Sequence, residues 1–434
     1  MPIFGQTYTW NSYTTDNSPL PSNNLHALDL GSDGILWIGS DSGLTGYNGS
    51  AWISYNTSNS DLAANNISSI QIDADNIWLG SNNGLSAGQV NAPDNISWDA
   101  PYQTDNSDLI HNTLKSINID SLGAVWVGTD SGITVITDTG WLSFTTASEF
   151  LLSENKILSI NQQPTHMQYI GTEDGGVSRL YKDVDGISGA STIWKQWTSL
   201  TDSTGLIRGL LSDTVTAILV DKNGDRWFGT QQGLSFHTGA FLKNPYSWRN
   251  YTTETGLINN IVQALAEDSS GAIWIGTTGG VSKLIPADTT WTHFTVEEGL
   301  VSNNVRDISI ADNGVIWLAT DGGLSQITVN PTVIKSDRQA HPKMFEVYPA
   351  YPNPFNMSTT IKIQVNTTQQ IKITIFDING RLVNTILNST FMPGTYKVNW
   401  NGKNVAGNAM ASGIYFAYIS SLNLKSLIKL VLIK

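Results

Sequence analysis

The chain has 434 residues, of which 40% are hydrophobic and 14% are charged, and it contains no cysteine. These figures exclude a disulfide scaffold, a thiolate metal site, an iron–sulfur cluster and a cysteine nucleophile. The formal net charge of −13 argues against nucleic-acid binding, which needs clustered Lys and Arg. No run of about eighteen apolar residues predicts a transmembrane helix. The 39 glycines and 15 tryptophans, together with so little charge, favour an all-β fold.

Four strand patterns recur seven times at intervals of roughly 40–50 residues. An aromatic strand opens the chain and returns around Trp10, Trp52, Trp98, Trp141, Trp197, Trp248 and Trp291. A strand with alternating apolar residues follows, at 24–30, 67–72, 114–117, 157–160, 215–218, 261–265 and 305–308. A strand ending in an aromatic, an apolar and a small residue comes next, at 37–39, 78–80, 126–128, 169–171, 227–229, 274–276 and 317–319. The last strand starts with Gly and a branched apolar residue, at 43–44, 84–85, 132–133, 176–177, 233–234, 280–281 and 323–324.

Seven units of four strands predict a seven-bladed β-propeller over residues 1–330. The chain starts with the fourth strand of a unit and reaches only the third strand of the last unit. We therefore expect residues 7–14 to pair with residues 325–329 and close the ring, which would cover two exposed sheet edges. One unit is longer, at 179–212, and is expected to form a special loop that carries Asp183, Asp185 and Trp194.

The charge of the chain changes sign near residue 337. Residues 338–434 hold ten Lys/Arg and two acidic residues, a formal charge of +8, which leaves −21 for residues 1–337. A step of this size marks a domain boundary. We expect a polar linker at 331–343 and a small second domain at 344–434.

The unit Asp268–Ser282, with its pattern Asp-x-x-Gly-x-Ile-Trp-Ile-Gly-Thr-x-x-Gly-Val-Ser, resembles the two-component regulator propeller repeat. In that family the repeats form the extracytoplasmic sensor of hybrid histidine kinases. The resemblance covers residues 7–330, but the chain carries no membrane helix, no kinase module and no second set of seven repeats. It therefore implies the fold and not the signalling activity.

The tail resembles the C-terminal sorting domain of the type IX secretion system, an Ig-like sandwich related to the flagellar hook-capping Ig-like fold. The resemblance begins at the segment Tyr351, Pro352, Asn353, Pro354, Phe355 and Asn356, and it ends at the basic, apolar stretch that closes on Lys434. It implies export across an outer membrane, with the type IX machinery as partner and the protein secreted or held at the outer-membrane surface. Residues around Ile373 and Val398 are expected in the core. Because Met1–Gln6 lacks a basic start and an apolar run, we expect a signal peptide to be missing from a truncated N-terminus.

A ligand site on a propeller is expected where the turns between second and third strands meet the loops that precede the first strands. The turns offer Asp41, Asn82, Asp130, Glu173, Gln231 and Asp321. The loops offer Asn24, Asn66, Asn112, Asn155, Asn260 and Asn304. A ring of amides and carboxylates suits hydroxyl-rich or cationic ligands, although Asn and Asp also cap turns.

Other candidate groups have structural explanations. The regular spacing of the tryptophans indicates packing between blades, so that only Trp194, off the repeat, is a candidate ligand platform. The stretch Asp221–Asp225 resembles the start of a calcium loop, but position 232 is Gln232 where such a loop needs Glu, and a hairpin turn explains it. Asp183 and Asp185 are slightly better metal candidates. No pair of histidines has metal-ligand spacing, and His111 is the one considered for catalysis.

Three functional hypotheses follow. The first is an exported, non-catalytic propeller that binds a glycan, a peptide or a surface partner. The second is a propeller lyase or hydrolase with acidic groups on the same face. The third is a fragment of a sensor or a larger adhesin. An acidic mouth without Lys, Arg or convergent His favours the first. No cofactor or metal is predicted, and the chain is expected to be a monomer.

Overall fold

The computed structural model describes residues 5–92, 94–148, 152–163, 167–181, 193–199, 209–238, 248–332, 345–348, 350–366, 368–377, 381–421 and 425–433. The chain divides into two compact units, one of residues 4–332 and one that contains residues 333–434. Almost all regular structure in the described residues is β-strand, apart from one short 3₁₀ helix, η2 (Thr253–Thr255). Within these residues, no helix has the length and apolar character needed to cross a membrane.

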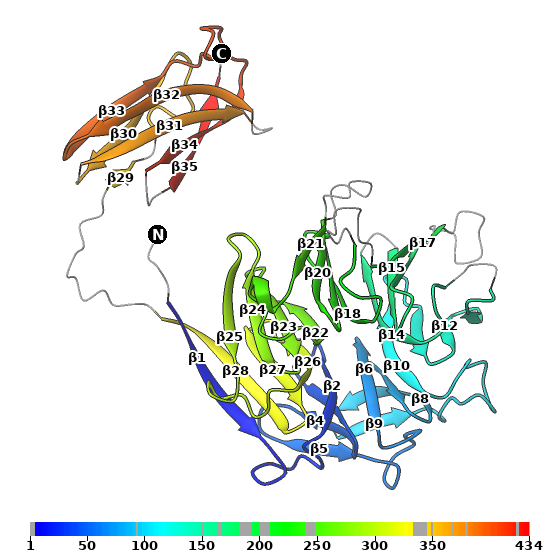
Figure 1. Cartoon of the computed structure of the whole chain (residues 1–434). Coiled ribbons are helices and arrows are strands. Elements are labelled where there is room, and N and C mark those ends of the chain that lie inside the picture. Colours follow the sequence, from blue (N-terminus) through cyan, green and yellow to red (C-terminus); the bar gives the residue numbers. More distant parts are fainter. Residues whose placement is uncertain are drawn as a thin grey trace. The chain divides into compact units, whose positions relative to one another are not determined.

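The first unit consists of seven four-stranded antiparallel sheets, which confirms the predicted seven-bladed propeller (Figure 1). Blade 1 contains β2 (Leu25–Leu30), β3 (Leu36–Ser40), β4 (Gly43–Tyr47) and β5 (Trp52–Tyr55). Blade 2 contains β6 (Ile67–Asp73), β7 (Asn76–Ser81), β8 (Gly84–Ala92) and β9 (Asn95–Trp98). Blade 3 contains β10 (Leu114–Ile119), β11 (Val125–Thr129), β12 (Gly132–Thr137) and β13 (Gly140–Phe144).

The later blades repeat this order. Blade 4 contains β14 (Ile157–Gln163), β15 (Met167–Thr172), β16 (Val177–Tyr181) and β17 (Ile193–Trp197). Blade 5 contains β18 (Val215–Val220), β19 (Arg226–Thr230), β20 (Gly233–His237) and β21 (Trp248–Tyr251). Blade 6 contains β22 (Val262–Glu267), β23 (Ile273–Thr277), β24 (Gly280–Ile285) and β25 (Thr290–Phe294). Blade 7 contains β26 (Val305–Ile310), β27 (Val315–Thr320), β28 (Gly323–Thr332) and, from the N-terminus, β1 (Gly5–Tyr13).

The ring closes through the N-terminal strand. β1 pairs antiparallel with β28 from Gly5 opposite Thr332 to Tyr13 opposite Leu324, and Figure 1 shows the two strands side by side. The first strands of successive blades adjoin one another around the ring, and β26 of blade 7 adjoins β2 of blade 1. The pairing expected from the phase of the repeat is therefore present.

Blade 6 shows why the repeated residues are needed. The Asp268 carboxylate accepts hydrogen bonds from Ala272 N at 3.1 Å and from the buried indole Nε1 of Trp274 at 3.0 Å, which fixes the turn before β23. A Cβ added at Gly276 would lie 2.9 Å from Val305 of the next blade. Gly280 has φ +123°, and a Cβ there would lie 2.5 Å from the carbonyl oxygen of Phe294. Each of these three repeated features of the unit thus has a steric or hydrogen-bonding cause.

The tryptophans of the second strands form the packing between blades. Trp37 clusters with Leu62 and Ile67 of the next blade, and Trp227 clusters with Leu257 and Val262. The most deeply buried of these second-strand tryptophans are at most 1% exposed: Trp37, Trp126, Trp227 and Trp274. Their repeated spacing therefore reflects the core.

The second unit is a two-sheet Ig-like sandwich. One sheet has the order β29 (Phe345–Val347), β30 (Thr359–Val365), β33 (Gly394–Trp400). The other has the order β32 (Leu382–Phe391), β31 (Gln369–Asp377), β34 (Gly413–Ser420), β35 (Lys425–Leu432). Its core includes Ile373 and Val398, as predicted, around the buried Trp400.

The segment Tyr351–Asn356 is built into this sandwich. The Asn353 side chain donates to Lys429 O at 2.7 Å and accepts from Val431 N at 2.8 Å, so it holds the last strand. Phe355 is 2% exposed and packs against Trp400, with ring centroids 5.4 Å apart. Tyr351 is the opposite case, since 82% of its surface is exposed. Lys434 lies outside the described residues.

Candidate functional site

The two sets of residues expected at a ligand face lie at the same end of the blades. A backbone hydrogen bond joins members of both sets, from Asp41 N to Asn24 O at 3.4 Å, and the same bond recurs in blade 3 from Asp130 N to Thr113 O at 3.2 Å. We call this end the mouth and define it by two positions in each blade: the residue before the first strand and the first turn residue after the second strand. A third position in each blade also lies at the mouth. The sequence analysis did not identify this position.

That third position is a β-bulge at the second residue of every first strand. The bulge residues are His26, Ser68, Lys115, Leu158, Thr216, Gln263 and Arg306. Several of them reach the neighbouring blade: Ser68 Oγ donates to Leu114 O at 2.7 Å, and Arg306 Nη1 lies 3.4 Å from Leu25 O. A bulge re-aims a side chain, and here it turns one residue per blade toward its neighbours at the mouth.

Asp41 is the centre of a network between blades 7, 1 and 2. Its carboxylate lies 2.6 Å from His26 Nε2, accepts from Asn66 Nδ2 at 2.7 Å, and also accepts from Asn24 Nδ2. Arg306 Nη1 in turn lies 2.8 Å from His26 Nδ1 and 2.7 Å from Asn24 Oδ1. Partial burial acts to raise the pKa of Asp41, but the hydrogen bonds from His26, Asn24 and Asn66 outweigh it and hold that pKa below its usual value.

Asp321 extends the network on blade 7. It accepts from Ser302 Oγ at 2.6 Å and from Asn304 Nδ2 at 2.7 Å, and Asn304 Oδ1 accepts from Gln263 Nε2 of blade 6 at 2.7 Å. Partial burial opposes ionisation, yet these hydrogen bonds and the charge of Arg306 lower the pKa of Asp321. Both acids are therefore ionised acceptors at neutral pH.

Blades 3 and 4 carry a second group of charges. Lys156 Nζ lies 2.6 Å from Glu173 Oε1, and this hydrogen bond raises the pKa of Lys156. Asp130 is close enough to add to that effect, and its buried Oδ1 has no hydrogen-bond partner among the described residues. Lys115 is exposed at the bulge of blade 3. The mouth therefore holds a second charged cluster, in which Lys156 is paired with Glu173 and lies near Asp130.

The expectation of a mouth free of Lys, Arg and His is wrong. Arg306, Lys115, Lys156 and His26 all lie there, because they occupy the bulge positions and the position before a first strand. The acidic residues are therefore paired with cations. Asn82 and Gln231 lie exposed at their turns, as expected, and Thr278 is the residue at this position in blade 6.

Half of the asparagines expected at the mouth serve another purpose. Asn112, Asn155 and Asn260 accept hydrogen bonds from backbone N–H groups of their own loops, at 2.9, 2.7 and 2.8 Å. The mouth position is the next residue in the chain, which in these blades is Thr113, Lys156 and Ile261. The turn-capping explanation is thus correct for these three residues.

Two further candidates are corrected. His111 Nδ1 accepts from Thr113 N at 3.0 Å, as Ser212 and Ser302 do at the same position of other blades, so it caps a turn. Trp194 was expected off the repeat, but it lies in β17, opposite Leu180, as part of a regular fourth strand. Asp183 and Asp185 lie outside the described residues.

Asp221 is a turn residue. Its Oδ1 accepts from Asn223 N and Asp225 N at 2.9 and 3.0 Å, and its Oδ2 accepts from Trp227 Nε1 at 3.0 Å. All these contacts repeat those of Asp268 in blade 6, which supports the hairpin explanation. Among the described residues, no group of three or more His, Asp or Glu side chains is placed to hold a metal ion.

The fold and the mouth together define a seven-bladed β-propeller with a preformed polar network at one end, followed by an Ig-like sandwich. Residues 256–279 match the two component regulator propeller family, and residues 353–423 match the FlgD Ig-like domain. The resemblance to the propeller repeat and the Ig-like fold expected for the tail are confirmed over these stretches. No curated protein sequence matches the chain.

Solved structures share the fold at low sequence identity. The extracellular domain of a hybrid two component system from B. thetaiotaomicron is 17% identical with a TM-score of 0.60, and the match covers 98% of this chain and 57% of that one. PorZ, a surface component of the type-IX secretion system of Porphyromonas gingivalis, is 19% identical with a TM-score of 0.57, covering 96% of this chain and 61% of that one. A streptogramin B lyase is 11% identical with a TM-score of 0.55, covering 74% and 98%. The chain thus spans about three fifths of the first two structures.

Proposed function

We propose that the chain is an exported, non-catalytic binding protein whose propeller mouth takes a glycan, a peptide or a surface partner. The observation that carries this proposal is the network around Asp41 and Arg306, because its donors and acceptors are already ordered before any ligand arrives. A site ordered in advance loses less conformational entropy on binding. Ionised carboxylates, amides and a guanidinium suit the hydroxyl, amide and charged groups of such ligands.

A lyase or hydrolase at the same mouth is the alternative. General acid–base catalysis needs a group that can reach a substrate proton at a suitable pKa. Both ring nitrogens of His26 are engaged, one with Asp41 and one with Arg306, and Asp41 and Asp321 have lowered pKa values. This arrangement favours binding over proton transfer.

The test of the mouth uses the full chain on glycan and peptide arrays. The double variant Asp130→Ala/Glu173→Ala should reduce binding of any ligand found by at least about tenfold, since it removes two charge-assisted acceptors. The matched control, Asp94→Ala/Asp138→Ala, removes two exposed acids from turns at the other end of the blades. Equal binding by both double variants would contradict the mouth assignment.

The C-terminal unit is proposed to direct export through the type IX secretion system. The support is the segment Tyr351–Asn356 and the Ig-like fold, while the likeness to PorZ is one of fold. Asn353 and Phe355 are used inside the sandwich, whereas Tyr351 is the large apolar side chain of this segment that lies exposed, so we take it as the one that a receptor would contact. Removal of residues 344–434 should abolish surface delivery in a host with this secretion system.

A finer test compares two residues of equal exposure. Tyr351→Ala should lower surface delivery without unfolding the sandwich. Met357→Ala should not, although Met357 is also 82% exposed and lies in the same unit. Normal export of the chain without residues 344–434 would reject the sorting role, whatever the mouth binds.

A further inference from the structure

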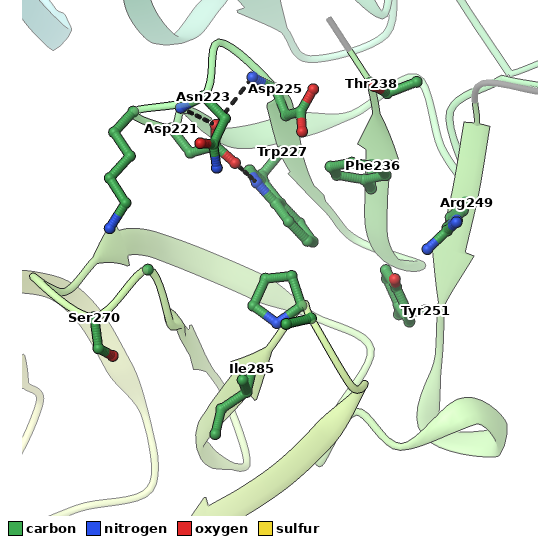
Figure 2. A pocket seen from close by; sticks show the side chains of 14 residues that line it. Asp221, Asn223, Asp225, Trp227, Phe236, Thr238, Arg249, Tyr251, Ser270 and Ile285 are labelled. Carbon is green, nitrogen blue, oxygen red and sulfur yellow. Dashed lines mark hydrogen bonds between the residues drawn. The ribbon is translucent and has the colours of Figure 1, made fainter. Parts of the chain in front are cut away.

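A cavity of about 510 Å³ lies between blades 5 and 6 (Figure 2). It is lined by the turn between β18 and β19, the turn between β22 and β23, and the turn after β24. In antiparallel blades these turns lie at the opposite end from the mouth. We call this cavity the groove; it belongs neither to the mouth nor to the Ig-like unit.

The walls of the groove combine an aromatic and apolar part with charged and polar side chains. On blade 5, Trp227 and Phe236 have ring centroids 4.4 Å apart, and Trp227 stacks on Tyr251 at 6.3 Å. On blade 6, the wall is Ile285, with 38% of its surface exposed, followed by Pro286. A flat apolar group could therefore lie between the two blades.

The equivalent place between blades 6 and 7 is filled by the chain itself. Lys283 stands opposite Trp274 where blade 5 has Phe236 opposite Trp227, and its Nζ lies 5.0 Å from the Trp274 ring centroid. Tyr8 of β1 also covers this place, 4.7 Å from Phe294. In blade 6 the hairpin of β24 and β25 turns directly after Ile285. These two strands therefore end before they reach the position that Tyr8 occupies on β1 in blade 7. The groove is thus open because blade 6 has a shorter outer hairpin.

The charged side chains that line the groove differ in how many hydrogen bonds and ion pairs they make. Asp221 accepts three hydrogen bonds, and Lys222 Nζ lies 3.4 Å from Glu267 Oε1 and 3.3 Å from Ser269 O. The guanidinium of Arg249, by contrast, makes no hydrogen bond or ion pair within the described part of the chain, and the residue is exposed. The second acid that lines the groove, Asp225, lies directly before β19. Arg249 lies on β21, and β20 separates these two strands, so Asp225 and Arg249 are not on neighbouring strands.

Arg249 is well placed to receive a ligand. It lies on β21 opposite Phe236 and two residues before Tyr251, so that Arg249 and Tyr251 point to the same side of the strand. Figure 2 shows both among the side chains that line the groove. A guanidinium offers paired donors whose geometry matches a carboxylate.

We infer that the groove binds a carboxylate attached to a flat apolar body, with the carboxylate on Arg249 and the body between Tyr251, Phe236 and Ile285. Two sources share this chemistry: a free aryl-substituted carboxylic acid and the C-terminal aromatic residue of a peptide. The volume falls within the range of small-molecule sites. For a ligand of about eleven non-hydrogen atoms, ordinary ligand efficiency gives a Kd of about 1 mM.

The experiment titrates the full chain with 3-phenylpropionate, followed by ligand-observed NMR, and repeats the titration with the neutral 3-phenylpropionamide. Wild type should bind the acid saturably and the amide at least about tenfold more weakly. Arg249→Gln should weaken binding of the acid by the same factor. Arg381→Gln, an exposed arginine of the Ig-like unit, is the matched control and should bind like wild type. Ala287→Trp, at an exposed position of the groove, should prevent binding of both probes.

A second arm separates the two sources. The peptide Gly-Gly-Phe is compared with its C-terminal amide and with 3-phenylpropionate. Tighter binding of the peptide acid than of phenylpropionate identifies a peptide terminus as the source, and the reverse order identifies a free acid. The proposal fails if no probe binds saturably up to about 10 mM, if the amides bind as well as the acids, or if Arg249→Gln has no effect.

Discussion

The first prediction concerns His237, a histidine buried where other blades have apolar residues. It is 2% exposed and lies between Trp197 and Trp248, with ring centroids at 4.8 and 4.7 Å. Burial, and then the positive charges of Arg226 and Arg179, lower the pKa of His237 to about 4, against a weak opposing effect of Asp225. The folded propeller therefore keeps this ring neutral over a pH range in which the unfolded chain protonates it.

The sign and the size of the effect follow from linkage. A depressed pKa gives stability that is fully present above the unfolded value of about 6.5 and is lost as the pH falls toward about 4. Between about pH 7.5 and about pH 5, the loss is about 2 kcal/mol. For a propeller of about 330 residues, the unfolding entropy converts this loss to a decrease in Tm of about 3 °C.

The perturbation is His237→Leu, since Leu284 occupies the same register position in blade 6. Other groups change with pH as well: burial raises the pKa of Asp29 to about 6 and that of Asp307 to about 7, which gives stability at low pH that is lost as the pH rises. These contributions are common to both proteins and cancel in the comparison.

The assay is differential scanning calorimetry of the full chain at the two pH values. Wild type should lose more Tm than His237→Leu when the pH falls from about 7.5 to about 5. The decrease should be about 3 °C smaller in His237→Leu. Phe236→Leu, a neighbouring substitution without a titrating group, controls for packing and should lower Tm equally at both values. An unchanged pH dependence in His237→Leu would refute the reasoning.

Three further predictions test the scaffold by thermal unfolding. Deletion of residues 1–13 should lower the Tm of the propeller by roughly 8 °C or more, because it removes β1 and its half-buried aromatic rings; an unchanged Tm would contradict ring closure. Asp268→Ala should cost about 2–4 kcal/mol, since Trp274 Nε1 and two backbone N–H groups lose their acceptor, whereas Asp288→Ala in an exposed turn should cost little. Asn353→Ala should lower the Tm of the Ig-like unit by releasing β35, and leave the propeller transition unchanged.

The architecture could be predicted because the same steric demands recur in every blade. The expected fourth-strand tryptophans, from Trp10 to Trp291, lie in β1, β5, β9, β13, β17, β21 and β25. Period-two alternation located the first strands, and the glycines located the starts of the third strands. Each signal was present seven times, so that an error in one copy could not change the result. The order of the strands and the phase of the ring then followed from connectivity.

The mouth could be predicted only in part. The turn residues Asp41, Asp130 and Asp321 were found because the turn has a constant spacing from the second-strand aromatic residue. The bulge residues His26 and Arg306 were missed, because a bulge inserts one residue without interrupting the apolar alternation on either side. A comparison of the second residue of each first strand across the seven copies would have shown that this position holds Lys, Arg or His in three of them.

Capping and mouth asparagines could not be separated by composition alone. In blades 1, 2 and 7 the chain has two successive asparagines, as at Asn23 and Asn24, of which the first caps the loop and the second faces the mouth. In blades 3 and 4 only the capping asparagine is present, and in blade 6 the pair is Asn259 and Asn260, of which the second caps the loop, so aligning asparagines shifted the register by one residue. Where a short polar residue can satisfy either a turn or a ligand, the backbone register decides.

Departures from the repeat are therefore the informative positions in this chain. Arg226 and His237 stand where blade 6 has Ile273 and Leu284, and both are almost fully buried. Arg226 Nε donates to Tyr169 Oη at 2.8 Å, so one of these charges already has a partner in the neighbouring blade. Blades 1, 3, 6 and 7 have apolar or aromatic pairs at these positions, such as Val125 with Ile136, and burying cations costs free energy. The interface between blades 4 and 5 is thus less stable than apolar residues at these two positions would make it. The variant His237→Leu measures how much of that difference in stability depends on pH.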